Sequence, residues 1–214
     1  MTGALAVSAA SPAFARPEPT IPSSTTSGST VTPSAPSTSP PATKPKAPTY
    51  PLPKKVASPR RLSIPALSID TKIYSVGLDK RKNVVIPEDI RRVGWYRLGV
   101  PPGVNRGNAV IVGHRDGSGY RRGAFYSLGS MRPGQVVTIR TSGKRDLRYR
   151  VISTKSLLKK RLPYEKYFAV DGKHRLVLIS CGGAYDRNNG GYQDNVIVTA
   201  EPLFTPIKVA PAKG

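Results

Sequence analysis

Apolar residues recur in short runs from about residue 60 onward, and Gly, Pro, Asn or Asp bounds each run. Residues with β-branched or aromatic side chains are frequent in these runs, which is typical of strands rather than helices. Several runs alternate polar and apolar positions, as half-buried antiparallel strands do. The sequence therefore predicts about eight strands, at Arg61–Ile64, Thr71–Val76, Asn83–Ile86, Ala109–Val112, Gln135–Thr141, Leu147–Thr154, Arg175–Ser180 and Val196–Thr199.

Two runs, Ala109–Val112 and Leu176–Ile179, are apolar throughout. A continuous apolar run is typical of a central strand that is buried on both faces. No segment has the pattern of a long helix, and only short helices are expected, at Pro87–Ile90, Ala124–Leu128 and Pro163–Phe168. Many short strands without long helices predict an all-β fold, either a closed barrel or a sandwich.

The N-terminal part of the chain has a different composition. Residues 1–15 carry no charge and end in Ala13-Phe14-Ala15, a pattern typical of a signal-peptidase site, so we interpret them as the remnant of a signal peptide or signal anchor. Of the 44 residues in 16–59, 12 are Pro and 16 are Ser or Thr. Such a segment buries too little apolar surface to fold, which predicts a disordered linker. The folded domain is then expected at 60–203, followed by a C-terminal tail at 204–214.

The charge is strongly positive, with 34 Lys and Arg against 12 Asp and Glu and a net charge of +22. This balance favours anionic surroundings such as nucleic acid, acidic lipid or wall polymer, without distinguishing among them. The single Cys excludes intramolecular disulfides and Cys-cluster zinc sites, and two His argue against a His-rich metal site. We therefore expect no metal and no cofactor.

The two fully apolar strands end in reactive residues, because Gly113-His114 follows the first and Cys181 follows Ser180 in the second. If the strands are neighbours, the thiol and the imidazole face one another across a cleft. The two glycines after Cys181 leave backbone N–H groups available to a developing oxyanion. The second histidine, His174, lies among polar residues at the start of a strand, where we expect it to be exposed and without a catalytic role.

These features resemble the sortases, the cysteine transpeptidases of Gram-positive cell surfaces. The segment that ends in Cys181 is similar to the family's Thr-Leu-x-Thr-Cys motif, with Val177 and Ser180 in place of the two Thr. Further similar segments span residues 61–203, among them Val93-Gly94-Trp95-Tyr96, Gly113-His114, Gly123-Ala124-Phe125 and Tyr192-x-Asp194-Asn195. The Cys181-Gly182-Gly183 and Tyr-x-Asp-Asn features most resemble class F, an actinobacterial group.

The resemblance implies a closed sortase-type barrel at 60–203 that cleaves an LPxTG-like sorting signal between Thr and Gly. Cys181 would attack the Thr carbonyl as a thiolate, and His114 would protonate the leaving amine. A catalytic Arg is also implied. Gln193 occupies the position where we expect it, and Arg187 is the only Arg after Cys181, so we assign the role to Arg187. An apolar groove would hold the substrate, with Val110, Val112, Ile179 and Val196 as candidate linings.

The implied partners are surface proteins with a C-terminal sorting signal and an amine-bearing cell-wall precursor. The protein would be a monomer without a specific nucleic-acid partner, contacting the membrane only through its N-terminal segment. It would act at the outer face of the plasma membrane or in the wall. Two alternatives remain open: an L,D-transpeptidase-like wall enzyme, whose Ser-x-Gly-Cys-x-Arg signature is absent, and a basic β-barrel that binds nucleic acid or another anionic polymer.

Overall fold

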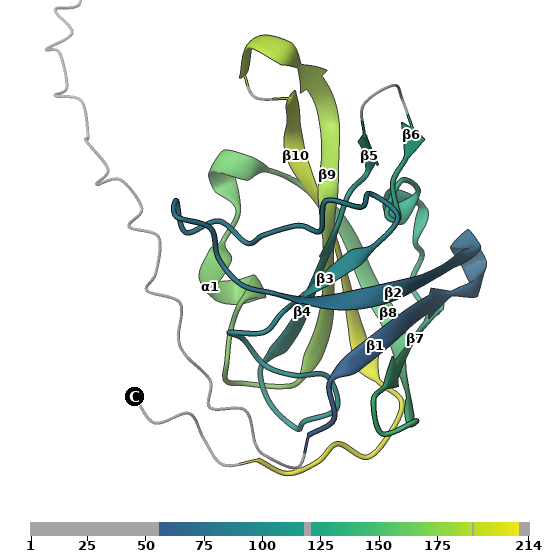
Figure 1. The fold of residues 1–214 in the computed structure, drawn as a ribbon. Helices are drawn as coiled ribbons and strands as arrows, with labels where there is room; N and C mark the ends of the chain where they lie inside the picture. The colour runs from purple at the N-terminus through teal and green to yellow at the C-terminus, as the bar shows by residue number, and fades with distance from the viewer. Residues whose placement is uncertain (1–55, 118–120, 190, 210–214) are drawn as a thin grey trace, which may run out of the picture. The chain divides into compact units, whose positions relative to one another are not determined.

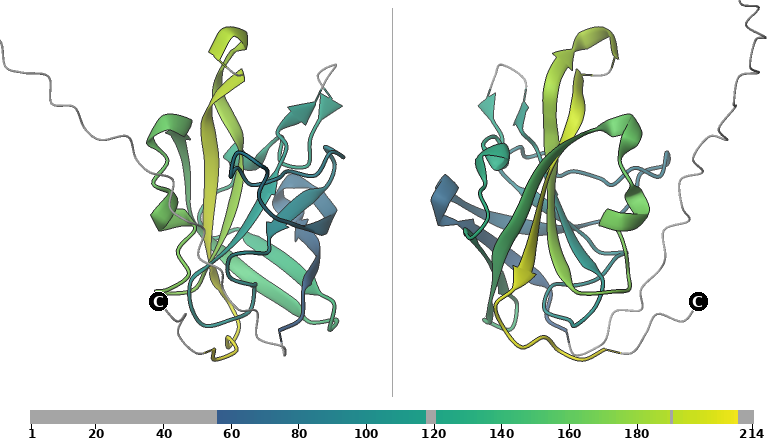
Figure 2. Two further views of the ribbon diagram at one scale, coloured as in Figure 1. Left: turned by 60° about the vertical axis from the view of Figure 1, so that its left-hand side comes forward. Right: turned by 180° about the vertical axis from the view of Figure 1, so that it is seen from behind.

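The computed structural model describes residues 56–117, 121–189 and 191–209. The expected signal remnant at 1–15, the linker up to residue 55 and the last residues of the tail lie outside the described residues. The described chain is mostly β, and eight of its strands close into one barrel in the order β1-β2-β3-β4-β9-β10-β8-β7 (Figures 1 and 2). The prediction of an all-β closed barrel is confirmed.

The barrel strands have the following bounds: β1 Pro59–Ile64, β2 Ile69–Val76, β3 Val93–Tyr96, β4 Asn108–Gly113, β7 Val136–Thr141, β8 Asp146–Leu158, β9 Arg175–Asp186 and β10 Gly191–Pro202. Two short strands, β5 Asp116–Gly117 and β6 Arg121–Arg122, pair outside the barrel. Among the described residues, five short helical turns connect the strands: η1 Pro65–Leu67, η3 Leu128–Ser130, η4 Lys159–Arg161, α1 Tyr164–Tyr167 and η5 Arg187–Asn189. Most strands pair antiparallel, but β3 lies parallel to β2 and β9 lies parallel to β4.

One predicted strand is wrong. Asn83–Ile86 lies in the β2–β3 loop, where Val84 makes only an isolated bridge to Leu78. The carboxylate of Asp79 accepts hydrogen bonds at 2.8 Å from the backbone N–H groups of Arg81 and Asn83, which bends the chain instead of extending it.

The barrel strand that the sequence did not predict is β3, which takes the place between β2 and β4. Of the short helices, the expected Pro163–Phe168 contains α1, whereas the expected Ala124–Leu128 is a turn that leads into η3. The expected Pro87–Ile90 is not helical.

Apolar side chains of β4 and β9 pack on both sides of the barrel wall. Leu176 and Leu178 belong to the cluster inside the barrel, while Val177 and Ile179 belong to a second cluster. Because successive side chains of a strand point to opposite faces, this second cluster lies on the outer face. Residues of α1 and of the β2–β3 loop cover it, including Tyr167, Leu78, Val84 and Ile86. The prediction that both strands are buried on both faces is confirmed.

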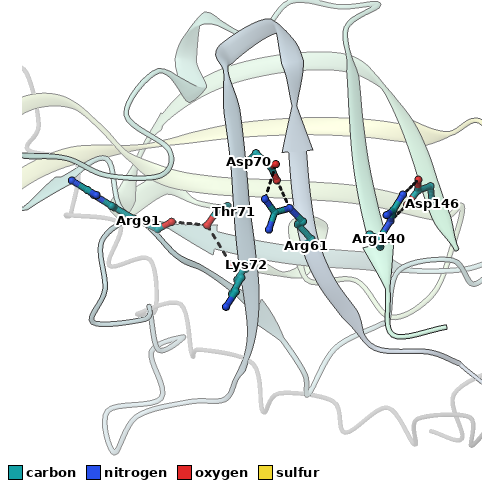
Figure 3. Close-up of polar contacts among 7 residues, drawn as sticks. All are labelled: Arg61, Asp70, Thr71, Lys72, Arg91, Arg140 and Asp146. Carbon is teal, nitrogen blue, oxygen red and sulfur yellow. Dashed lines mark hydrogen bonds and ion pairs between the residues drawn. The ribbon is translucent and has the colours of Figure 1, made fainter. Parts of the chain in front are cut away.

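Two ion pairs on the outside of the barrel join neighbouring strands, and a buried hydroxyl holds the β2–β3 loop (Figure 3). Arg61 on β1 contacts Asp70 on β2 at 2.6 Å, and Arg140 on β7 contacts Asp146 on β8 at 2.6 Å. The hydroxyl of Thr71 donates a hydrogen bond of 2.5 Å to the backbone carbonyl of Arg91. This last bond fixes the end of the β2–β3 loop, which forms one wall of the site described below.

The expectation that His174 is exposed is wrong, because this residue is buried, with only 2% of its surface exposed. Its Nδ1–H donates a hydrogen bond of 2.8 Å to the carbonyl of Gly107, and its Nε2 lies 3.1 Å from the hydroxyl of Tyr149. Burial lowers the pKa of the imidazole by removing the charged form from water. His174 lies in the core just before β9 begins, whereas Cys181 lies near the middle of that strand.

Candidate active site

Parallel pairing of β4 and β9 brings the two reactive residues together. The register pairs Val112 with Ile179, so an extension by two residues on each strand sets His114 opposite Cys181. Both residues continue the outward-facing positions of their strands, which are Val110 and Val112 on β4 and Val177 and Ile179 on β9. Since neighbouring strands lie about 4.8 Å apart, this extended register would place the imidazole and the thiol on the same face, next to each other.

Cys181 lies at a groove of about 600 Å³ on the outer face of the barrel. Apolar side chains from the β2–β3 loop and from the α1 region form most of its walls, among them Leu78, Val84, Ile86, Leu162 and Phe168. This volume and this apolar character suit a peptide segment with aliphatic side chains. Of the four expected lining residues, Val112 and Ile179 line the groove, whereas Val110 lies in the core beneath it and Val196 packs against Gly182.

A backbone carbonyl holds the imidazole of His114. Its Nε2 lies 3.0 Å from the carbonyl oxygen of Pro87, which can only accept, so Nε2 carries a proton. Nδ1 is then the nitrogen left for proton transfer in the neutral ring. Gly113 before it has no room for a side chain, because an added Cβ would lie 2.6 Å from the ring of Phe125. The β2–β3 loop therefore both walls the groove and orients the imidazole.

The two glycines after Cys181 allow β10 to approach β9 closely. A Cβ on Gly182 or on Gly183 would lie 2.5 Å from the side chain of Val196 or of Asp194 respectively. Gly183 also has a φ of 73°, in the left-handed region that other residues rarely adopt. These contacts give the Gly-Gly pair a packing role, which the sequence alone did not indicate.

β10 presents Asn195 directly beside Cys181. The two residues are cross-strand partners, and both line the groove. The neighbouring Asp194 accepts a hydrogen bond of 2.8 Å from the hydroxyl of Ser156 on β8. No hydrogen bond joins the side chain of Asn195 to any residue in the described part of the chain. The sequence placed Asn195 in a motif but did not indicate its contact with Cys181, because that contact depends on a β-bulge between Tyr192 and Asp194 that sets the register.

Three side chains connect the segment after His114 to β10. The hydroxyl of Tyr192 donates a hydrogen bond of 2.5 Å to the carboxylate of Asp116, and this bond raises the pKa of the phenol. The guanidinium of Arg115 lies 4.8 Å from the centre of the Tyr192 ring, a cation–π contact. Tyr192 therefore ties the histidine-bearing segment to the strand that runs beside Cys181.

The two candidates for the role of the family's catalytic Arg belong to the β9–β10 hairpin, which projects beyond the barrel (Figures 1 and 2). Arg187 is exposed in η5, directly after the end of β9. The amide nitrogen of Gln193 donates hydrogen bonds to the carbonyls of Gly191 and Asn189, at 2.6 and 3.1 Å. Gln193 therefore stabilises the hairpin itself, and its amide hydrogens already have acceptors.

The described ranges contain no group of three or more His, Cys, Asp or Glu side chains placed to hold a metal ion. Within the same ranges, no helix is both long and apolar enough to cross a membrane. The chemistry that the site offers is that of a thiol, an imidazole and several amide groups beside an apolar groove.

Comparisons with known proteins agree with this arrangement. A family model described as a sortase domain matches residues 62–203. No curated protein sequence matches the chain. Solved structures with a similar fold include sortase C2 of pilus island 1 from group B Streptococcus, which is 23% identical with a TM-score of 0.51. That match covers 68% of this chain and 73% of the streptococcal chain.

Two further structures have comparable similarity. Sortase C-1 from Actinomyces oris is 23% identical with a TM-score of 0.52, and the match covers 67% of this chain and 73% of the other. A lid mutant of sortase A from Corynebacterium diphtheriae is 20% identical with a TM-score of 0.53, and covers 72% of each chain. At these sequence identities the structural similarity shows a shared fold only. The assignment to a family rests on the family model, which matches residues 62–203.

Proposed function

Because the chain belongs to the sortase family, we propose that Cys181 is the nucleophile of its transpeptidation reaction and His114 the general acid. The protein is a sortase-type cysteine transpeptidase. It cleaves an LPxTG-like sorting signal between Thr and Gly and transfers the acyl group to an amine acceptor of the cell wall, which is the reaction of the family. The comparisons do not support the L,D-transpeptidase or polymer-binding alternatives.

The observation that supports the assignment of residues is the parallel register of β4 and β9, which pairs Val112 with Ile179. Extended by two residues, this register would bring His114 opposite Cys181, which lines the groove. A free thiol has a pKa of about 8.5, so a neighbouring imidazolium is needed to favour the thiolate near neutral pH. The Cys181 sulfur attacks the Thr carbonyl carbon, and the electron pair of the C=O bond moves to oxygen. When this intermediate collapses, the C–N bond breaks and the leaving Gly amine takes a proton from His114.

The acyl group is then held as a thioester on Cys181. An incoming amine attacks the thioester carbonyl, His114 accepts the proton of that amine, and Cys181 leaves as thiolate. The peptide bond that is formed replaces the one that was broken, so the reaction needs no external energy source. The Leu and Pro of the signal would occupy the apolar groove, where Val112 and Ile179 form the floor next to Cys181.

We assign to Arg187 the role of holding a substrate carbonyl from the hairpin beyond the groove. The support is that Arg187 is the only Arg after Cys181 in the sequence and that its side chain is exposed. Gln193, the alternative, has its amide hydrogens bonded within the hairpin.

Membership of class F is part of the proposal. It is supported by two sequence features, Cys181-Gly182-Gly183 and Tyr192-x-Asp194-Asn195. The two glycines pack closely against side chains of β10. Tyr192 bonds Asp116, Asp194 bonds Ser156, and Asn195 lines the groove. The enzyme acts at the cell surface on proteins that carry sorting signals. We further propose that it works as a monomer tethered through its N-terminal segment and that a wall precursor supplies the amine.

The test is a quenched fluorescent library of Leu-Pro-x-Thr-Gly peptides, assayed with an amine acceptor. Cys181→Ala and His114→Ala should each abolish transfer, while circular dichroism and the melting temperature stay near the wild-type values. His174→Gln is the matched control, because it changes the other histidine of the chain and should leave turnover within a few-fold. Substantial transfer by the folded Cys181→Ala variant would sink the assignment of the nucleophile.

A further inference from the structure

We propose that Asn195 is a further catalytic residue, whose side-chain amide donates a hydrogen bond to the scissile carbonyl oxygen as Cys181 attacks. This inference rests on the proposed function, since it takes Cys181 as the nucleophile. It names the donor for the oxyanion, a role that neither the sequence pattern nor the family model assigns to this position.

The first observation is the register. Asn195 on β10 is the direct cross-strand partner of Cys181 on β9. Directly opposed residues of an antiparallel pair have Cβ atoms about 4.5–5.5 Å apart, on the same face of the sheet. That face is the outer one, because Ile197, the next outward position on β10, belongs to the same cluster as Ile179. The amide and the thiol therefore lie side by side.

The second observation is the surroundings of the amide. Asn195 and Cys181 both line the groove of about 600 Å³, so a peptide bound there contacts both side chains. Polar neighbours on β10 have intramolecular partners: Tyr192 bonds Asp116, Gln193 bonds Gly191, and Asp194 bonds Ser156. Asn195 makes no side-chain hydrogen bond with the residues that the structure describes. A partly buried amide without a partner at a groove wall is available to a ligand.

The third observation concerns the competing donors. Arg187 lies beyond the end of β9, six residues after Cys181, which corresponds to roughly 20 Å of extended strand. Gln193 has its amide hydrogens bonded to hairpin carbonyls. Asn195 is adjacent to the nucleophile and does not need to move.

The amide acts on the charge that develops during attack. As the Cys181 sulfur bonds to the carbonyl carbon, the oxygen becomes negative, and the Nδ2–H of Asn195 donates to it. When the tetrahedral intermediate collapses, the C=O bond re-forms and the amine leaves with a proton from His114. Asn195 neither gains nor loses a proton, so its contribution is electrostatic. Removal of one such donor lowers kcat by about 10²–10³-fold in enzymes that use an oxyanion hole.

The experiment measures kcat and KM with a Leu-Pro-x-Thr-Gly peptide for Asn195→Ala, Asn195→Asp and the control Asn105→Ala, which changes an exposed asparagine of the β3–β4 loop that does not line the groove. We expect Asn195→Ala to lower kcat by about 10²-fold with little change in KM. Asn195→Asp, close to isosteric, should be at least as impaired, because a carboxylate cannot donate and repels the oxyanion. Asn105→Ala should stay within a few-fold of wild type.

The rate at which iodoacetamide alkylates Cys181 separates catalysis from structure. Alkylation has no oxyanion, so Asn195→Ala should react at the wild-type rate if its thiol and imidazole are intact. Equal losses in alkylation and in peptide cleavage would overturn the proposal in favour of a structural role. A kcat within three-fold of wild type for folded Asn195→Ala and Asn195→Asp would overturn it as well. If instead Cys181→Ala stayed active, the proposed function itself would fail.

Discussion

The hydroxyl of Tyr192 on β10 donates to the carboxylate of Asp116, two residues after His114, at 2.5 Å. This bond joins the two sides of the site, since β10 pairs with the strand of Cys181 and Asp116 belongs to the segment of His114. The guanidinium of Arg115 covers the same ring at 4.8 Å. We therefore expect Tyr192 to position the segment that carries His114, and to affect the reaction only through that residue.

Tyr192→Phe should therefore lower turnover several-fold while the ring and its contact with Arg115 remain. The lost hydrogen bond to a carboxylate is worth about 1–2 kcal/mol near the surface. The measurement is kcat and KM across pH 5–9, where a change in the pH profile reports a displaced imidazole. Tyr185→Phe is the control, because Tyr185 packs edge-on against Tyr192 and its exposed hydroxyl has no hydrogen bond within the described residues. Equal, pH-independent effects in both variants would argue against a positioning role.

Arg187→Ala tests the role proposed for Arg187. If Arg187 holds a substrate carbonyl, its loss should lower kcat/KM by about 10²-fold, mainly through KM, because the contact is already made in the ground state. Arg187→Lys should restore little, since an ammonium does not reproduce the planar guanidinium. The measurement is peptide cleavage beside Gln193→Ala. A near-normal Arg187→Ala with a strongly impaired Gln193→Ala would move the role to position 193.

The burial of the two strands that precede His114 and Cys181 could be predicted from sequence because it depends on a strong local pattern. An uninterrupted apolar run is typical of a central strand, and a reactive residue follows each of the two runs. β3 escaped prediction for the opposite reason, since Val93–Tyr96 is four residues long, contains Gly94 and alternates in neither polarity nor burial. Asn83–Ile86 was wrongly predicted as a strand because it is rich in β-branched residues. In the structure, Val84 and Ile86 form part of the groove wall instead.

The surroundings of Asn195 and His174 could not be predicted from the local sequence pattern. Asn195 reaches Cys181 only because a bulge after Tyr192 shifts the pairing of β10 with β9. His174 has polar neighbours in sequence, but Tyr149 from β8 covers it and bonds its ring. Both environments are set by residues distant in sequence, and a single sequence does not reveal that register.

Two truncations of the N-terminus should distinguish the residues that only precede the barrel from those that stabilise it. Deletion of residues 1–55 should leave the melting temperature and the cleavage of a soluble peptide unchanged. Deletion of residues 1–59 should lower the melting temperature by several degrees. It removes Val56 from a small apolar cluster, the bond of 2.8 Å between the Ser58 carbonyl and Ser142, and the pairing of Pro59 with Thr141. Identical melting temperatures for the two truncations would contradict the contribution of residues 56–59.

Stability should fall with decreasing pH through the titration of His174. Burial lowers its pKa in the folded protein below the value of about 6.5 expected in the unfolded chain. Between these two pKa values the unfolded state binds more protons, so the free energy of unfolding decreases as the pH falls below about 6.5. One group contributes a slope of at most about 1.4 kcal/mol per pH unit.

The measurement is urea unfolding of the wild type, His174→Gln and His114→Ala from pH 5 to 7.5. The slope below pH 6.5 should persist in His114→Ala and diminish in His174→Gln, whatever the absolute stability of each variant. Carboxylates such as Asp70 and Asp146 have lowered pKa values through their Arg partners and act in a more acidic window, so they do not account for a slope at pH 6. If His174→Gln does not fold, Tyr149→Phe provides the second comparison, because it leaves the imidazole buried and should keep a positive slope. An unchanged slope in folded His174→Gln, or its disappearance in His114→Ala, would assign the titration to another group.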